Sequence, residues 1–322
     1  MNVDDCLHQA KTVLSKNNQE HLLNFFDELN ESQKESLLSQ ILYTDFEHIN
    51  KLYINSFTDD IIKTEQISPI PYFSKSNLDS DAKDFYTSIG ERIISNGELA
   101  ILTLAGGQGT RLGFNGPKGC YEIEVPPKKS LFEFIYDKLK YTYEKYNIYI
   151  PWYIMTSPSN HQKTLSYFEN KNYFGYPKEK IYFFSQSTLP VIDVDGKVIL
   201  DNIYSIKTAS NGNGDVFYSF KNAGLNNTLF KQNIKWISIS GIDNIILDII
   251  DPLFIGLCSY NKSDISAKSV YNMPKGLFMK NGETLIERQI KQLKEAGIDD
   301  ITVVLGYKQE LYFFLVDKWG VN

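Results

Sequence analysis

The sequence predicts a doubly wound α/β fold with a mostly parallel sheet, preceded by a helical N-terminal region. Two observations predict the sheet: short apolar runs recur along the middle of the chain, and helical stretches separate them. A third predicts the helical region, because apolar side chains there recur at three- and four-residue spacing. In a sheet of this kind, ligand sites form at the carboxyl ends of the strands.

The helical N-terminal region is predicted from its periodicity. Apolar side chains at residues 37–42 alternate with polar ones as in an amphipathic helix. Ser32, with Glu35 three residues later, fits the capping box that begins a helix. We expect an extended connector at residues 67–71 and another helix over residues 79–94. Because no reactive cluster occurs in this region, we interpret it as a packing element without chemistry.

Four short apolar runs predict the strands of the sheet. The first, residues 99–104, lies between Asn96-Gly97 and Ala105-Gly106-Gly107, which is typical of a buried parallel strand that ends in a turn. The other runs are residues 152–155, 181–184 and 236–239. Helical stretches at residues 131–143 and 161–168 lie between them, as βαβ units require.

A pattern from the middle of the chain recurs near its end. Pro117-Lys118-Gly119 precedes Leu131-Phe132-Glu133 and a helix. Pro274-Lys275-Gly276 precedes Leu285-Ile286-Glu287, a helix and a strand over residues 301–305, but no glycine-rich loop comes before it. We therefore expect three parts, namely a helical region with its connector (1–95), a core (96–270) and a partial second copy of the core's design (271–322).

Composition and charge exclude several classes of function. Hydrophobic residues make up 42% and charged residues 22% of the chain, as in soluble globular proteins. No apolar stretch approaches the roughly 20 residues of a membrane helix. Acidic residues stand where a signal peptide has basic ones, so we expect a cytoplasmic protein with no membrane partner. The net charge of −6 argues against nucleic acid as a partner but permits a small phosphorylated ligand.

The cysteines and histidines do not form a metal-binding pattern. The three cysteines lie far apart with no CxxC spacing, so we expect buried thiols rather than disulfides or a zinc site. The four histidines show no HxH or HxxxH spacing, and we interpret them as structural or surface residues.

The strongest candidate for chemistry is the glycine-rich loop LAGGQGTRLG, residues 104–113, followed by Pro117-Lys118-Gly119. Glycines at the end of a strand let backbone N–H groups approach a phosphate without obstruction. Arg111 offers a planar fork for phosphate oxygens, and Lys118 a compact positive charge. The alternative is a tight turn with solvated charges, which such a dense run of special residues disfavours.

Two better-known phosphate-binding loops do not fit. A P-loop requires Lys followed by Ser or Thr after G-x-x-x-x-G, and this chain has no such sequence here. A dinucleotide-binding loop requires G-x-G-x-x-G, whereas Gly107, Gly109 and Gly113 give one residue more, with a cation inside the loop. A nicotinamide-dependent dehydrogenase is therefore a poor match.

Further motifs follow the loop in order. They are WYIMTS (152–157), YFG (173–175), FFSQ (183–186), DGK (195–197), GNG (212–214), DN (243–244) and DPLFIG (251–256). Together with the loop, they resemble the eukaryotic-type UDP-N-acetylglucosamine pyrophosphorylases of the UDP-sugar pyrophosphorylase family. The resemblance implies a Rossmann-like nucleotidyltransferase fold with its core in residues 96–270. It also implies that UTP and N-acetylglucosamine 1-phosphate react, with Mg²⁺ as cofactor, to give UDP-N-acetylglucosamine and pyrophosphate.

The resemblance assigns the phosphate end of the nucleotide to the loop. It implies that Arg111 and Lys118 are the catalytic residues, because both cations contact the phosphates. The backbone that holds the nucleotide is supplied by Leu104, Ala105, Gly106 and Gly107. Catalysis would be in-line attack assisted by positioning and electrostatics, with no nucleophilic side chain.

The nucleoside and the metal are assigned to later motifs. Gln186 offers a carboxamide that pairs with the edge of uracil, and Gly212 and Asn213 let the chain pass close to the nucleoside. Taken alone, Gln186 is typical of a satisfied polar strand end, and the glycine-rich run is typical of a turn. Asp243 follows the last strand and is the expected Mg²⁺ ligand. Its alternative role is the N-cap of a following helix.

The chain departs from the family pattern in two places. Where the family usually has Asp-Gly-Asn-Gly-Gly, this chain has Asn211-Gly212-Asn213-Gly214-Asp215, so Asp215 is expected to place a negative charge near the nucleotide. From Met273 to Lys308, the chain is instead similar to the early part of bacterial sugar-phosphate and phosphocholine nucleotidyltransferases. The family's sugar-binding segment is not recognised.

Three hypotheses follow. The first is an active uridylyltransferase that makes a UDP-sugar. The second is a catalytically impaired nucleotide-binding protein, or a module that acts within a larger assembly. The third is a phosphocholine-type cytidylyltransferase, but Gln186 together with Gly212 and Asn213 favours uracil over cytosine.

Overall fold

The computed structural model describes residues 2–57, 72–124, 126–268, 279–280, 283–295, 297, 299, 301 and 312–321. The chain separates into two compact units, Met1–Lys262 and Ser263–Asn322, and each is described by itself. The connector expected at residues 67–71 lies outside the described residues, as does the strand expected over 301–305 apart from Ile301.

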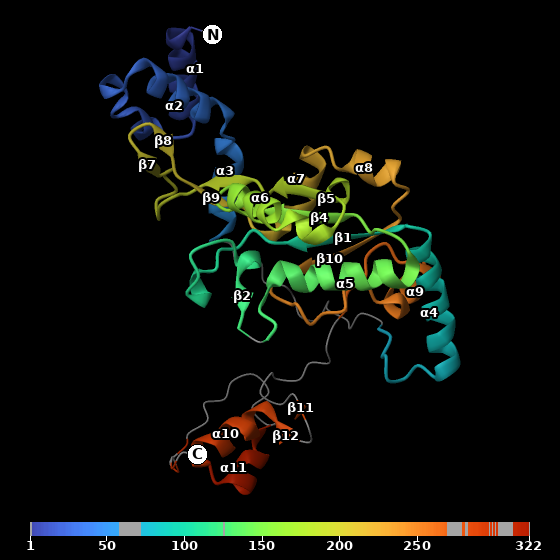
Figure 1. Ribbon diagram of the computed structural model, residues 1–322. Helices are drawn as coiled ribbons and strands as arrows, with labels where there is room; N and C mark the ends of the chain where they lie inside the picture. The colour runs from blue at the N-terminus through green and yellow to red at the C-terminus, as the bar shows by residue number, and fades with distance from the viewer. Residues whose placement is uncertain are drawn as a thin grey trace. The chain divides into compact units, whose positions relative to one another are not determined.

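Helices and a central sheet form the first unit (Figure 1). The helices are α1 (Val3–Lys16), α2 (Glu31–Tyr43), α3 (Phe46–Asn55), α4 (Ser80–Ser95), α5 (Leu131–Tyr146), α6 (His161–Asn170), α7 (Val216–Asn222), α8 (Asn226–Lys231) and α9 (Pro252–Tyr260). The strands of the central sheet are β1 (Leu99–Leu104), β4 (Trp152–Thr156), β5 (Ile181–Ser185) and β10 (Trp236–Gly241). The paired short strands are β2 (Glu122–Ile123) with β3 (Lys129–Ser130), β6 (Thr188–Pro190) with β9 (Thr208–Ser210), and β7 (Leu200–Asn202) with β8 (Ser205–Ile206).

The central sheet has the order β10-β1-β4-β5, and each neighbouring pair is parallel. Leu104 at the end of β1 is in register with Gly241 of β10 and with Met155 of β4. The chain moves from β1 outward to β4 and β5, and then returns to the other side of β1 to form β10. The strand order therefore reverses between β1 and β10, which is the position where ligand crevices form in sheets of this type. The predicted parallel sheet is confirmed.

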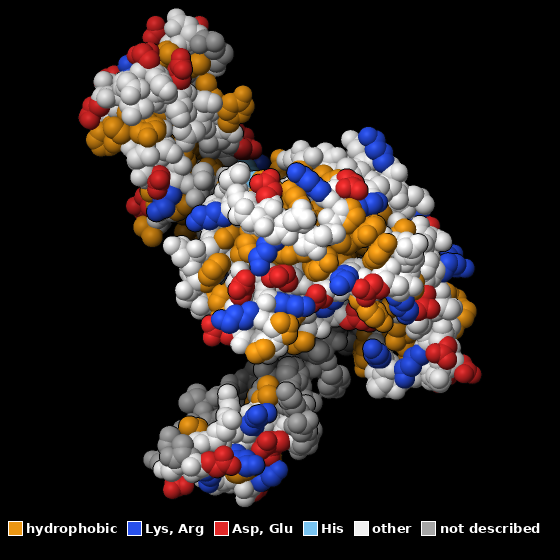
Figure 2. Space-filling view, in the orientation of Figure 1, with side chains coloured by type: hydrophobic (Ala, Val, Ile, Leu, Met, Phe, Trp, Pro, Cys, Tyr) orange, Lys and Arg blue, Asp and Glu red, His pale blue; other side chains and the backbone are white. Residues whose placement is uncertain are grey.

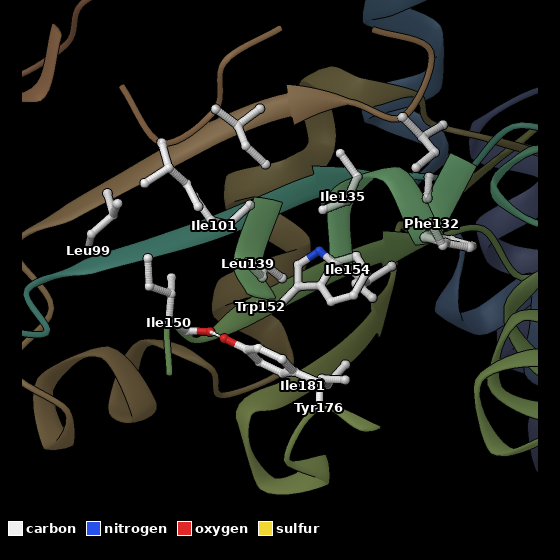
Figure 3. Close-up of a cluster of buried hydrophobic side chains, with 14 of the residues drawn as sticks. Leu99, Ile101, Phe132, Ile135, Leu139, Ile150, Trp152, Ile154, Tyr176 and Ile181 are labelled. Atoms are coloured by element: carbon white, nitrogen blue, oxygen red, sulfur yellow. Dashed lines mark hydrogen bonds between the residues drawn. The ribbon is translucent and has the colours of Figure 1, made fainter. Parts of the chain in front are cut away.

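Alternation along β1 explains why helices cover both faces of the sheet. Leu99 and Ile101 join a buried cluster with side chains of α4, α5 and α9 (Figure 3), whereas Ala100 and Leu102 join a second cluster with α7. Polar groups inside the first cluster have partners, since Trp152 Nε1 donates to Thr103 Oγ1 at 2.9 Å. Each fully buried large side chain stabilises the fold by roughly 1.5–3 kcal/mol.

The N-terminal helices pack against the β7–β8 hairpin rather than standing apart. Val198 and Ile206 belong to the same buried cluster as side chains of α1, α2 and α3. Gln19 donates to Gly196 O at 3.0 Å and accepts from Val198 N at 2.9 Å. Gln40 does the same with Tyr204 O at 3.2 Å and Ile206 N at 2.8 Å.

The start of α2 corrects one expectation. Asn30 is the N-cap, and it forms a reciprocal capping box with Gln33 at 3.0 Å in both directions. The predicted box of Ser32 and Glu35 is wrong, because Asn30 and Gln33 present the same pattern two residues earlier and Asn is at least as good a cap as Ser.

The second unit contains the antiparallel pair β11 (Met279–Lys280) and β12 (Glu283–Thr284), followed by α10 (Leu285–Glu295) and α11 (Phe314–Trp319). Thr284 and Glu287 form reciprocal hydrogen bonds at the start of α10. Ser130 and Glu133 do the same at the start of α5, after the hairpin of β2 and β3. The repeated pattern in the sequence thus corresponds to a repeated hairpin, cap and helix, although Pro274–Gly276 lie outside the described residues.

The surface agrees with the composition. Figure 2 shows Lys and Arg side chains interspersed with Asp and Glu over the visible face of the first unit. Within the described ranges, no helix combines the length and the hydropathy that crossing a membrane requires.

Candidate active site

The predicted site residues follow strands that end at the same edge of the sheet. Ala105, Gly106 and Gly107 come directly after β1, Gln186 follows β5, and Asp243 lies two residues beyond β10. Because the four strands are parallel, these loops meet at their common carboxyl edge.

The glycine-rich loop is held by a residue that the sequence did not reveal. Asn160 is fully buried, and its Nδ2 donates to Ala105 O at 3.0 Å and to Gly107 O at 3.1 Å. Its Oδ1 accepts from Ser157 N at 2.8 Å. No hydrogen bond within the described part of the chain uses the backbone N–H of Gly106 or Gly107. These two donors are therefore free for an anion.

The rest of the loop folds back on its own start. Gly109 N donates to Gly116 O at 2.8 Å, and Lys118 N donates to Gly107 O at 3.0 Å. A β-carbon placed on Gly107 would lie 3.7 Å from Lys118 Cε, so the lysine stem contacts the glycine directly. The fold thereby brings Lys118 beside the free N–H groups although eleven positions separate it from Gly107 in the sequence.

Lys118 also connects this loop to the end of β10. Its Nζ lies 2.9 Å from Asp243 Oδ1, and the two side chains are 22% and 66% exposed. Asp243 does not cap a helix, because the next helix is α9 and its N-cap is Asp251, which accepts from Phe254 N. The capping alternative for Asp243 is therefore wrong. In the part of the chain that the structure describes, no cluster of three or more His, Cys, Asp or Glu side chains could hold a metal.

Gln186 has an unpartnered oxygen inside the protein. The residue is only 5% exposed, and its Oε1 is buried without a hydrogen-bond partner. Its Nε2 packs against the loop, since a β-carbon on Gly106 would lie 2.4 Å from it. A buried unpaired acceptor costs about 1–3 kcal/mol, so the interpretation of Gln186 as a satisfied strand end is wrong. A buried water molecule or a ligand that supplies a donor would remove this cost.

Arg111 remains exposed. It lies in the 3-10 helix Thr110–Leu112, which ends at Gly113 with a φ of +69°. Among the described residues, no carboxylate forms an ion pair with its guanidinium. The cation is therefore available to a ligand that binds the loop.

The predicted nucleoside loop lies beside the residue after Gln186. Gly212 has a φ of +87°, a conformation that favours glycine, and Asn213 is exposed at the start of a 3-10 helix. Asn211 N donates to Ser187 O at 3.0 Å, which ties this loop to the end of β5.

Asp215 does not present a free charge at this loop. Its side chain is buried, with 7% exposure, and it accepts from Ser187 N at 2.7 Å and from Asn211 Nδ2 at 3.1 Å. Ser219 Oγ also donates to it. Burial alone would raise the pKa of Asp215, but the hydrogen bonds from Ser219, Ser187 and Asn211 outweigh burial and lower the pKa below its ordinary value. The lowered pKa keeps the carboxylate ionised, so the negative charge expected at this loop is retained, while both of its oxygens accept hydrogen bonds from the protein.

Comparisons with known proteins bear on this arrangement. A family model described as UTP–glucose-1-phosphate uridylyltransferase matches residues 43–308, so the match continues into the C-terminal segment. A probable UDP-N-acetylglucosamine pyrophosphorylase of Dictyostelium discoideum is 36% identical over 285 residues, which cover 82% of this chain and 58% of that protein. The UDP-N-acetylglucosamine pyrophosphorylase of Saccharomyces cerevisiae is 35% identical over 264 residues, covering 80% and 54%. The chain therefore spans somewhat more than half the length of these curated relatives.

Solved structures of proteins with the same description are also similar to this chain. The crystal structure of the uridine diphosphate N-acetylglucosamine pyrophosphorylase from Trypanosoma brucei, in complex with an inhibitor, is similar with a TM-score of 0.65 and 28% identity. The similarity covers 81% of this chain and 55% of that one. A putative UDP-N-acetylglucosamine pyrophosphorylase from Entamoeba histolytica is similar with a TM-score of 0.56 and 30% identity, over 61% and 51% of the two chains.

Proposed function

The chain belongs to the UTP–glucose-1-phosphate uridylyltransferase family and has the Rossmann-like nucleotidyltransferase fold, and from this premise we propose that it is a uridylyltransferase. It joins UTP to a sugar 1-phosphate, with N-acetylglucosamine 1-phosphate as the first choice, and releases pyrophosphate. The choice of sugar is supported by the names of its relatives. We place the reaction in residues 96–270, between the helical region and the C-terminal segment.

The observation that carries this proposal is the unpartnered Oε1 of Gln186 beside Gly106. Uracil carries a donor at N3 next to acceptors at O2 and O4, and a carboxamide can satisfy one donor and one acceptor of that edge. Cytosine has no hydrogen at N3 and carries its donor at the 4-amino group instead, so an acceptor placed opposite N3 favours UTP over CTP. Gly212 and Asn213, in the loop that Asn211 ties to Ser187, would then face the nucleoside.

The reaction itself needs positioned charges rather than a nucleophilic side chain. An oxygen of the sugar phosphate attacks the α-phosphorus of UTP, and the bond from that phosphorus to the bridging oxygen of the β-phosphate breaks. The backbone from Leu104 to Gly107 holds the nucleotide. Lys118 and Arg111 stabilise the negative charge that builds on the phosphates, and preorganised cations of this kind supply most of the catalysis in phosphoryl-type transfers.

A divalent cation fits the carboxylate at the end of β10. Mg²⁺ in nucleotide enzymes typically takes one or two protein carboxylates and completes its shell with phosphate oxygens and water. Asp243 provides one exposed carboxylate, and Lys118 occupies only one of its oxygens. We propose that Asp243 holds Mg²⁺ together with the triphosphate. When bound, the ion would neutralise phosphate charge.

The proposal is tested by pyrophosphate release. Purified protein with Mg²⁺ is given UTP or CTP together with a panel of sugar 1-phosphates and phosphocholine. We expect release with UTP and N-acetylglucosamine 1-phosphate. Release only with CTP and phosphocholine would establish the cytidylyltransferase instead, and nucleotide binding without release would establish a nucleotide-binding protein.

A further inference from the structure

Asp215 occupies the N-cap position of α7, but its side chain binds a different segment of the chain. It directly precedes α7, yet its carboxylate forms no capping hydrogen bond with that helix. The carboxylate instead accepts from Ser187 N at 2.7 Å, on the chain segment that follows β5. Burying a carboxylate is costly unless hydrogen bonds compensate. Here it is compensated by Ser187, which follows Gln186, by Asn211, which precedes Gly212, and by Ser219 of α7.

Residues 187–211 form one long excursion of the chain away from the sheet, and Ser187 and Asn211 are its two ends. The excursion leaves the sheet at Ser187, and β6 and β9 pair antiparallel at its base, with Thr188 opposite Ser210. It returns at Asn211, whose Nδ2 donates to Asp215 Oδ1 at 3.1 Å and whose N donates to Ser187 O at 3.0 Å. Asp215 therefore joins the outgoing and returning strands at the point where they meet the sheet.

We propose that Asp215 is a positioning residue for nucleobase recognition, which it serves by fixing Gln186 relative to the loop of Gly212 and Asn213. This inference rests on the proposed function. Ser187 is bonded directly to Gln186, so the hydrogen bond from Ser187 N to Asp215 sets the direction in which the chain leaves Gln186. The backbone N–H of Gln186 is fixed from the other side by Thr156 O at 2.9 Å.

The consequence is selectivity rather than general stability. The Gln186 carboxamide is held by packing against Gly106, and no hydrogen bond fixes its Oε1. Its orientation toward uracil N3 therefore depends on the backbone at residues 186 and 187. If that backbone relaxes, the carboxamide loses its alignment with the uracil edge, whereas the phosphate end of the nucleotide, held by the glycine-rich loop, is unaffected.

The test uses the full chain and the variants Asp215→Asn and Asp215→Ala. Asp215→Asn keeps the shape but removes the charge that strengthens the hydrogen bonds. The matched control is Asp193→Asn, because Asp193 is a carboxylate in the same excursion that accepts backbone N–H groups of Asp195 and Lys197, both at 2.9 Å. Binding of UTP and of CTP is measured by calorimetry, and turnover is measured with UTP and N-acetylglucosamine 1-phosphate.

We expect Asp215→Asn to raise the Kd for UTP by about tenfold, with a larger rise in Asp215→Ala. The Kd for CTP rises less than the Kd for UTP, so the ratio of UTP affinity to CTP affinity falls. The KM for UTP rises, while the KM for the sugar phosphate stays unchanged. A purely structural residue would lower the active fraction and leave the ratio of UTP to CTP affinity unchanged. Asp193→Asn behaves as the wild type.

The other outcomes separate a failure of this inference from a failure of the proposed function. If the wild type binds UTP and both Asp215 variants keep its affinity and its preference for UTP over CTP, this inference is overturned and the proposed function stands. An equal loss for UTP and CTP, or the same loss in Asp193→Asn, also overturns the inference alone. A wild type that binds no uridine nucleotide overturns the proposed function, and this inference with it.

Discussion

Lys118 Nζ lies 2.9 Å from Asp243 Oδ1, and this ion pair joins the loop after β1 to the residues after β10. The two strands are neighbours, and the strand order reverses between them. The pair therefore places a cation and a carboxylate side by side, and in the proposed reaction these are the groups that would bind the triphosphate and its divalent cation.

Removing the cation of this pair tests its catalytic role. Lys118→Ala should lower kcat by about a hundredfold to a thousandfold, because a preorganised charge at the phosphates is lost. Stability should change by less than about 1 kcal/mol, since Asp243 is largely exposed. The matched control is Lys145→Ala, which breaks a 2.7 Å ion pair with Glu91 on α4 and should keep the wild-type rate. A rate loss matched by a lower urea midpoint would argue against a catalytic role.

Arg111 supplies the second test of the phosphate end. Because its exposed guanidinium has no ion-pair partner among the described carboxylates, Arg111→Ala should abolish most turnover and leave the fold intact. Arg111→Lys should recover part of the rate, since a lysine keeps the charge but not the planar fork. Initial rates and thermal melts of the three proteins are compared. Near-normal activity in Arg111→Ala would remove this residue from the mechanism.

Gly106 is required for space rather than for backbone freedom. In Gly106→Ala, the new methyl would lie 2.4 Å from Gln186 Nε2, so the carboxamide must shift from its position against the loop. We expect the Kd for UTP to rise by about tenfold or more while the fold is retained, because the far end of a side chain can shift. Gly241→Ala is the control, since its methyl would meet no atom within 4 Å. Equal UTP affinity in both variants would contradict the placement of Gln186.

Asn160 should affect both stability and nucleotide binding. Asn160→Ala leaves the carbonyl of Ala105 and the N–H of Ser157 without their partner, while the carbonyl of Gly107 keeps only its hydrogen bond from Lys118 N. We expect a loss of about 2–4 kcal/mol in the free energy of unfolding, measured in urea, and weaker UTP binding. Ser159→Ala removes a 3.2 Å contact with Gln108 and a 3.0 Å contact with Ser157 Oγ but no contact with the loop carbonyls, and it should change stability by less than about 1 kcal/mol. Similar urea midpoints for the two variants would show that Asn160 is dispensable.

The second unit should become less stable in acid, because one of its buried carboxylates is protonated there. The hydrogen bond from Lys318, together with those from Thr284, lowers the pKa of Glu287 from 4.5 to about 2. A lowered pKa in the folded state means that Glu287 stabilises the fold fully above pH 4.5 and loses this contribution as the pH falls toward 2. Trp319 Nε1 donates to the same carboxylate at 3.3 Å, so its indole N–H resonance reports the change. In Glu287→Gln, this resonance should no longer shift over that range.

The strands were predictable because a buried strand is a run of apolar residues in its own stretch of sequence. The apolar runs at residues 99–104, 152–155, 181–184 and 236–239 begin at the first residues of β1, β4, β5 and β10, and the last three strands extend only one or two residues further. The inner strands β1 and β4 are buried on both faces, so nearly every position in them is apolar, whereas the edge strand β10 is partly exposed and contains two serines. The helices at residues 131–143 and 161–168 are likewise α5 and α6, each a few residues longer.

The supporting residues of the site were not predictable in the same way. Asn160 acts on Ala105, a residue 55 positions earlier, and Asp215 acts on Ser187, 28 positions earlier. Nothing near Asn160 or Asp215 in the sequence identifies these partners, because the fold alone brings them together. The roles of Gln186, Gly212 and Asn213 came from the resemblance, whereas the free oxygen of Gln186 became visible only in three dimensions.

Gln19, which follows α1, and Gln40 of α2 make contacts that bear on the behaviour of the protein in solution. A carboxamide carries the same donor and acceptor as a peptide group, so Gln19 and Gln40 occupy backbone groups of the β7–β8 region that another polypeptide could otherwise pair with. Unpaired strand edges are templates for aggregation and domain swapping. These contacts therefore leave fewer unpaired backbone groups for a second polypeptide, independently of any reaction at the glycine-rich loop.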